Sequence, residues 1–103
     1  MPDISFDADP NSGVSVYDST SYQGYVGWLV FGGTSVSSPS LAGIITSAGG
    51  NTSTNDELLL LYSGLGNSSY FRDILSGTAG GFNAVTGWDF VTGIGSCLTL
   101  TGK

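Results

Sequence analysis

The sequence contains no histidine and only one cysteine in its 103 residues. A nucleophile activated by an imidazole base is therefore excluded, as are zinc sites built from histidine and cysteine. The single cysteine, Cys97, has no partner for an internal disulfide, and we interpret it as an ordinary small residue that is buried or close to the terminus.

Basic residues and long apolar runs are also scarce. Two lysine or arginine residues stand against eight acidic ones, so the net charge of −6 argues against nucleic acid or an anionic membrane as a partner, while a cation could bind. No apolar run approaches the ~18 residues of a membrane span. The first ten residues have neither a basic start nor an apolar core, so we expect no signal peptide within this chain.

Glycine and small hydroxyl residues are abundant, with 17 glycines and a hydrophobic content of 40%. This amount of material suits one domain or a piece of one, with a modest core. The sequons at Asn51 and Asn67 would mark surface loops of a secreted protein.

The first half of the chain is predicted to form an α/β unit. Residues 3–8 and 13–19 are predicted strands around a turn at 9–13, in which Asn11 and Gly13 supply positive φ. The nearly continuous apolar run 25–33 is typical of a strand covered on both faces. A helix is predicted to start at residue 34, to carry Leu41, Ile44 and Ile45 on one stripe, and to end at Gly49 and Gly50.

The second half is predicted to be mostly loop. A short helix begins with Asn55 as its cap, has Asp56 and Glu57 in its first turn, and ends before Gly64. From Tyr70 onward the glycine-punctuated sequence has no sustained period, which predicts a long loop region whose order has a functional or ligand-based cause.

Ser35 is the candidate nucleophile, because it lies where a buried strand turns into a helix. Unpaired N–H groups and the positive end of the helix dipole favour a developing oxyanion there. The alternative is that Thr34 or Ser35 only caps the helix. Pro39 adds an irregularity, since it removes the hydrogen bond that would reach back to the carbonyl of Ser35.

Asp7 and Asp9 share one face of the first predicted strand and could form an acid/base pair. Aspartates that flank a turn usually accept hydrogen bonds from backbone N–H groups, so we interpret them as turn caps. The clusters "GTAGG" and "GIG" lack the lysine and the strand-loop-helix setting of a phosphate loop.

Three blocks in this order, "PDISFDADPNSGVSVYD", "GWLVFGGTSVSSPSLAGI" and "YFRDILSGTAGGFNAVTGWDFVTGIGS", resemble the C-terminal part of the sedolisins. These are serine-carboxyl peptidases that include the tripeptidyl peptidases, and the resemblance covers residues 2 to about 96. It implies that residues 1–103 are the C-terminal portion of a subtilisin-like domain, with a parallel sheet, helices on its faces and a calcium-binding loop. It also implies secretion and a peptide or protein substrate.

The resemblance assigns the nucleophile to Ser35. The glutamate base, its supporting aspartate and the aspartate of the oxyanion hole lie upstream in the family, in segments that this sequence does not contain, so we expect the isolated chain to be inactive. A partner could be that missing N-terminal part. The sequence also departs from the family at its end, "CLTLTGK".

The resemblance further implies one calcium ion, bound by the carboxylates of Asp73 and Asp89 and the carbonyls of Ile74 and Gly87. Val85 replaces a residue that is often small in the family, at a position that contributes a carbonyl. The alternative is that both aspartates cap turns or that Asp73 pairs with Arg72. A rival interpretation of the whole chain is a non-catalytic secreted module stabilised by calcium, or the remnant of a peptidase gene.

Overall fold

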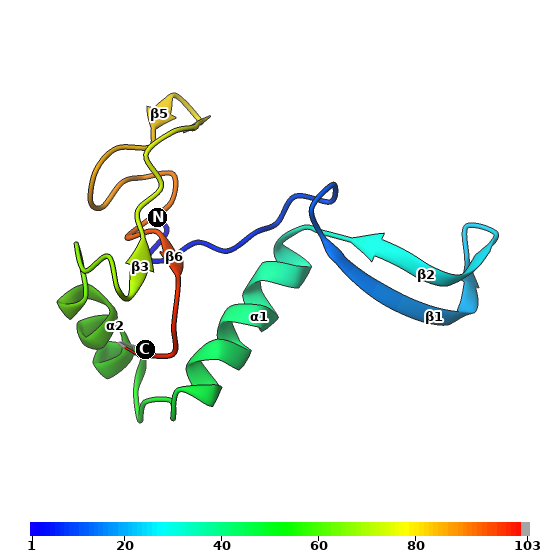
Figure 1. Cartoon of the computed structure of the whole chain (residues 1–103), viewed down its shortest axis with the longest axis horizontal. Helices are drawn as coiled ribbons and strands as arrows, with labels where there is room; N and C mark the ends of the chain where they lie inside the picture. The colour runs from blue at the N-terminus through cyan, green and yellow to red at the C-terminus, as the bar shows by residue number, and fades with distance from the viewer. Residues whose placement is uncertain (102–103) are drawn as a thin grey trace.

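A curved β-hairpin projects from the rest of the molecule in the computed structural model, which describes residues 1–101 (Figure 1). Its strands are β1 (Val14–Tyr22) and β2 (Tyr25–Phe31), paired antiparallel with Val14 opposite Phe31. Gln23 and Gly24 connect the strands with φ of 50° and 87°. Positive φ at both central residues is the mark of a type I′ turn, which matches the twist of the strands that it joins.

The predicted strand at residues 3–8 does not form. Residues 13–19 pair instead with the strand that follows them, and Ser5 alone makes a bridge in the earlier segment. The turn at 9–13 does form, with the Ser12 N–H donating to the Asp9 carbonyl (3.2 Å), but neither Asn11 nor Gly13 has positive φ. The local two-residue turn after β1 therefore determines the pairing.

Helix α1 (Thr34–Ser47) follows the hairpin and ends as predicted. Gly49 and Gly50 have φ of 112° and 63°, and the Gly50 N–H donates to the Ile45 carbonyl (2.9 Å), which closes the last turn. None of its residues is buried. A groove of about 530 Å³ runs between α1 and the N-terminal segment, lined in part by Phe6, Leu41 and Ile45.

Helix α2 (Thr54–Ser63) begins two residues earlier than the predicted cap implies. Ser53, not Asn55, is its N-cap, and the Ser53 Oγ accepts a hydrogen bond from the Asp56 N–H (3.2 Å). Asp56 and Glu57 occupy the first turn and Gly64 follows the end, as predicted. Both candidate caps are polar, but the earlier one lets the helix gain a further half turn.

The long loop region wraps around the end of α2 and supplies the core. Its short strands pair antiparallel, β3 (Phe71–Arg72) with β6 (Ser96–Cys97) and β4 (Thr78–Ala79) with β5 (Phe82–Asn83). Leu61, Phe71 and Ile94 form a small buried cluster, against which Cys97 packs half-buried. The chain therefore mixes helices and strands, as expected, with a core confined to one end of the molecule.

The N-terminal segment is tied to this core by contacts that are distant in sequence. Asp3 accepts a hydrogen bond from the Tyr62 hydroxyl (2.7 Å) through its side chain and one from the Ile94 N–H (2.9 Å) through its carbonyl. Ser5 forms a parallel bridge with Ser96, and this is the one parallel pairing within residues 1–101. The subtilisin-like parallel sheet is not seen in the described part of the chain.

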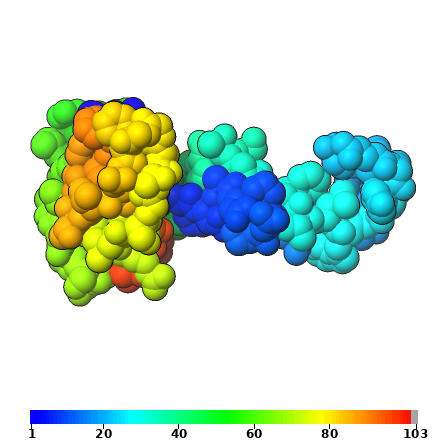
Figure 2. All heavy atoms as spheres, turned by 90° about the horizontal axis from the view of Figure 1, so that it is seen from above, coloured from blue at the N-terminus to red at the C-terminus, as the bar shows by residue number. Residues whose placement is uncertain are grey.

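Figure 2 shows the resulting shape, in which the N-terminal segment and α1 connect the core region to the projecting hairpin. The molecule measures 47 × 35 × 22 Å, and its radius of gyration of 15.7 Å exceeds the roughly 13 Å usual for 100 residues. Among the described residues, no helix is long and apolar enough to cross a membrane.

Candidate nucleophile and carboxylate sites

The junction between β2 and α1 is built from two glycines. Gly33 is the N-cap of α1 with φ 93° and ψ 174°, a conformation open essentially to glycine alone. A side chain at Gly32 would overlap the backbone of Pro10. The Gly33 N–H also donates to the Ala8 carbonyl (2.6 Å), so the N-terminal segment fixes the start of the helix.

Ser35 is the second residue of α1 and its side chain is exposed. Because Gly33 is the cap and no side chain caps the helix, the alternative that Thr34 or Ser35 is the N-cap is wrong. The N–H groups of Val36 and Ser37 both donate to the Gly33 carbonyl (3.0 and 3.3 Å). Within residues 1–101 the hydroxyl and the N–H of Ser35 make no hydrogen bond, so both are available to a ligand.

Pro39 lies inside α1, four residues after Ser35. It has no N–H to donate to the Ser35 carbonyl, so this turn of the helix lacks one of its backbone hydrogen bonds. Ser35 therefore stands at the free end of a helix whose first turns are partly unbonded.

Asp7 and Asp9 cap the turn before β1, as predicted. The Asp7 carboxylate accepts hydrogen bonds from the Asp9 N–H (2.9 Å) and the Ser12 hydroxyl (2.8 Å). These two bonds hold the pKa of Asp7 below its usual value of 3.8. Asp9 in turn accepts from the backbone and side chain of Asn11 (both 2.9 Å). Neither carboxylate is arranged as a base for Ser35.

Asp89 is buried, with 4% of its surface exposed, and it organises the loop around it. Its carboxylate accepts hydrogen bonds from the N–H groups of Val85 (3.0 Å), Val91 (2.8 Å) and Thr92 (2.7 Å). Burial raises the pKa of Asp89, but these bonds and the Thr92 hydroxyl outweigh burial and lower it below 3.8. Asp89 is thus an ionised cap, the structural role given above as the alternative to calcium binding.

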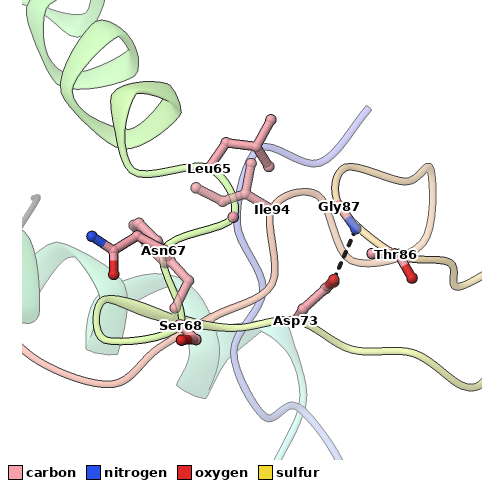
Figure 3. A pocket seen from close by; sticks show the side chains of 9 residues that line it. Leu65, Asn67, Ser68, Asp73, Thr86, Gly87 and Ile94 are labelled. Carbon is pink, nitrogen blue, oxygen red and sulfur yellow. Dashed lines mark hydrogen bonds between the residues drawn. The ribbon is translucent and has the colours of Figure 1, made fainter.

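Asp73 lies in a cavity of about 240 Å³ whose lining includes Leu65, Asn67 and Ile94 (Figure 3). Its Oδ2 accepts a hydrogen bond from the Gly87 N–H (2.8 Å), shown as the dashed line in Figure 3. Its Oδ1 is buried and has no hydrogen-bond partner. A carboxyl oxygen without a partner is costly to bury, so this atom fits a role as ligand for a cation.

The two aspartates of the expected calcium site converge on one short segment. Asp89 holds it at Val85 and Asp73 holds it at Gly87, in each case through a backbone N–H. Asp73 therefore suits calcium better than Asp89 does. Asp73 has an oxygen without a partner, whereas Asp89 would have to release hydrogen bonds to bind an ion. Within residues 1–101, no group of three or more acidic, cysteine or histidine residues is placed to hold a metal ion together, so backbone carbonyls or water would supply the other ligands.

Turn capping by Asp89 was expected as an alternative, but the three N–H groups that it accepts from were not predicted. A signal was present in the spacing of Asp89 and Thr92, because an aspartate commonly accepts hydrogen bonds from the N–H groups two and three residues after it. Glu57 was predicted in the first turn of α2, but its contacts were not: one carboxylate oxygen accepts from the Asn51 side chain (2.6 Å), and the other is buried without a partner.

The sequence of the chain is similar to part of a known protein. The chain is 38% identical over 104 aligned residues to a sedolisin from Pseudomonas sp. (strain 101), and the match covers 93% of the chain. The same match covers only 16% of the relative, so the chain spans about a sixth of its length. No family model and no solved structure matches the chain. The chain is therefore related to a segment of a sedolisin.

Proposed function

We propose that the chain is the nucleophile-bearing C-terminal portion of a serine-type, acid-acting peptidase of the sedolisin kind, and that Ser35 forms the acyl-enzyme. The observation that carries this proposal is the unpaired hydroxyl and N–H of Ser35 at a glycine-lined helix start. The match to a sedolisin supports it. The substrate class is peptides or proteins, cleaved internally or as tripeptides, and secretion belongs to the same proposal.

In this mechanism the Ser35 Oγ attacks the carbonyl carbon of the scissile peptide bond. A carboxylate base takes the hydroxyl proton and passes it to the leaving amine, so that an ester to Ser35 and a free amine result. The carbonyl oxygen becomes an oxyanion that the Ser35 N–H and the helix dipole stabilise. Water then hydrolyses the ester and regenerates the serine.

The base in this mechanism must come from outside the 103 residues. Histidine is absent, and the nearby Asp7 and Asp9 are committed to the turn. A carboxyl with a pKa of ~4.3 still accepts a proton at acid pH, where an imidazole with a pKa of ~6.5 is already protonated. A missing N-terminal part of the domain would supply this group, and the isolated chain would hydrolyse nothing above background.

A chimera tests the proposal, with this chain replacing the aligned segment of the Pseudomonas sedolisin. We expect a peptide aldehyde to form an adduct on Ser35 in the chimera, located by mass spectrometry, and no adduct on the isolated chain. A label on another serine of the chain would contradict the assignment. Acid proteolysis by the isolated chain that Ser35→Ala abolishes would show that an internal aspartate acts as the base.

We further propose that the loop region binds one calcium ion through Asp73 and Asp89, with the carbonyls of Ile74 and Gly87. The buried, unpartnered Oδ1 of Asp73 supports this proposal. Calcium takes 6 to 8 oxygen ligands, so water would complete the shell. The bound ion would give the buried Oδ1 of Asp73 a partner and reduce the flexibility of a glycine-rich loop.

Calcium at about 100 times its dissociation constant is expected to stabilise the chain by about 2.7 kcal/mol. Thermal melts at pH 6 should show a higher melting temperature that a chelator reverses. Asp73→Asn should abolish the effect, whereas Asp18→Asn in the hairpin should preserve it. No calorimetric heat, together with an unmoved melting temperature, would remove the site.

A further inference from the structure

Two asparagines of the chain begin the acceptor motif for N-linked glycans. Asn51 begins the sequon "NTS" and Asn67 begins the sequon "NSS". Both sequons have a serine two residues after the asparagine, where the motif requires a hydroxyl, and both asparagines are exposed. The motif therefore does not distinguish the two sites, and the structure around each asparagine decides whether its amide nitrogen is accessible.

The side chain of Asn67 is held by its oxygen, and its nitrogen is free. Asn67 lies in the loop between α2 and β3, and its Oδ1 accepts a hydrogen bond from the Ser69 N–H (3.0 Å). This is an Asx turn, in which an asparagine side chain bonds to the backbone two residues later. Within residues 1–101 neither the Asn67 Nδ2 nor the Ser69 hydroxyl makes a hydrogen bond. Figure 3 shows the Asn67 amide directed away from Asp73.

The backbone around Asn67 is fixed without any help from the amide nitrogen. The Asn67 N–H donates to the Gly64 carbonyl (2.9 Å), and the Asn67 carbonyl accepts from the N–H groups of Tyr70 and Phe71 (both 3.0 Å). A sugar joined to Nδ2 breaks none of these bonds and leaves the bond from Ser69 intact. The folded loop can therefore present the nitrogen to a transferase and keep its structure after the sugar is attached.

In the first sequon the same two groups are occupied by other contacts. The Asn51 Nδ2 donates to the Glu57 Oε2 (2.6 Å), and the Ser53 hydroxyl donates to the Asp56 Oδ2 (2.7 Å) at the start of α2. The other oxygen of Glu57 is buried without a partner, so loss of the Asn51 bond would leave this carboxyl group with no hydrogen bond among the described residues. An acceptor left in this way is destabilising, so the fold opposes modification of Asn51.

We infer that Asn67 is the site of an N-linked glycan and that the fold protects Asn51 from the same reaction. The co-substrate is an oligosaccharide joined to a lipid pyrophosphate. The Asn67 Nδ2 forms a bond to the anomeric carbon of the sugar, while the bond from that carbon to the pyrophosphate oxygen breaks. The electron pair of the broken bond and one amide proton go to the lipid pyrophosphate, which leaves. Ser35 takes no part, so the inference is independent of the proposed peptidase mechanism.

A purified oligosaccharyltransferase with a lipid-linked oligosaccharide tests this inference on the 103-residue chain, and peptide mass spectrometry measures the modification of each asparagine. In the folded chain Asn67 should be modified at least about tenfold faster than Asn51, because only Asn51 must first lose a hydrogen bond. Synthetic peptides of residues 48–56 and 64–72 serve as unfolded references. Their two rates should be similar, because neither peptide contains the contacts of the fold.

Glu57→Ala tests the cause of the protection. It removes the acceptor of the Asn51 amide, so the rate at Asn51 should increase while the rate at Asn67 stays the same. Asp18→Ala in the hairpin is the matched control, and it should change neither rate.

Three results would overturn the inference. The first is modification of Asn51 and Asn67 at equal rates in the folded chain. The second is a folded chain in which Asn67 stays unmodified although its peptide is a substrate. The third is the same preference for Asn67 in the two peptides, which would show that the local sequence and not the fold makes the choice. If Glu57→Ala does not fold, the comparison of the parent chain with the peptides still decides.

Discussion

Ser35→Ala in the chimera is expected to lower kcat by on the order of 10³- to 10⁶-fold with little change in stability. The substitution removes the oxygen that forms the acyl-enzyme, while the Ser35 side chain makes no hydrogen bond within the described residues whose loss would weaken the fold. Initial rates on a denatured protein substrate at about pH 4 measure the loss, at the pH where a carboxylate base still works.

Ser38→Ala is the matched control, because Ser38 is also an exposed serine near the start of α1 and should tolerate the change. An equal loss of kcat in both variants would show that the helix start, and not the Ser35 oxygen, matters. Unchanged activity in Ser35→Ala would remove the serine mechanism.

Asp89→Asn is expected to lower the melting temperature by roughly 10 °C, the largest stability effect that we predict. An amide has one acceptor oxygen and places two donors among N–H groups that already point at the site, so the bonds from Val85, Val91 and Thr92 cannot all be kept. Thermal melts followed by circular dichroism, with a chelator present, measure the loss without any contribution from a cation.

The same residue predicts how stability depends on pH. The pKa of Asp89 is lowered in the folded chain, so its stabilisation is present above the unfolded pKa of ~3.9 and is lost as pH falls through the folded value. As the pH drops below about 4, the melting temperature of the parent chain should therefore decrease, and this decrease should be steeper than that of Asp89→Asn. Asp7→Asn is the control, since Asp7 is exposed and its change should have a small effect. A variant as stable as the parent at pH 6 would contradict the capping role.

Features that depend on single residues, such as the end of a helix, could be predicted from the sequence. The pairing of strands could not. The end of α1 at Gly49 and Gly50 follows from the need for positive φ, which is a property of single residues. The partner of residues 13–19 depends on a turn at Gln23 and Gly24, where glutamine is an unusual residue for positive φ. The apolar pattern of β2 correctly indicated a strand, but the expected cover on both of its faces is wrong for the described residues, since Val26, Trp28 and Val30 are exposed.

For the candidate sites, the location of a residue could be predicted from the sequence, whereas its hydrogen bonds could not. The sequence placed Ser35 at a strand-to-helix turn, and the structure has it there with an uncommitted hydroxyl. The sequence could not reveal that Gly33 would be the cap, because that depends on the backbone angles of one residue. Calcium binding at Asp73 and Asp89 stays a prediction, since the hydrogen bonds of Asp89 are a tertiary property that no spacing determines.

The hydrogen bonds between residues 3–5 and residues 94–96 have a consequence for the order of folding. The Asp3 carbonyl accepts from the Ile94 N–H and the Ser5 N–H donates to the Gly95 carbonyl, about 90 positions along the chain. The β1–β2 hairpin pairs only residues that are near each other in sequence. Contacts of large sequence separation form slowly because they close long loops. During synthesis the hairpin can therefore form early, whereas the core can form only after residues 94–96 have left the ribosome. Until then the N-terminal segment is exposed and open to non-native contacts.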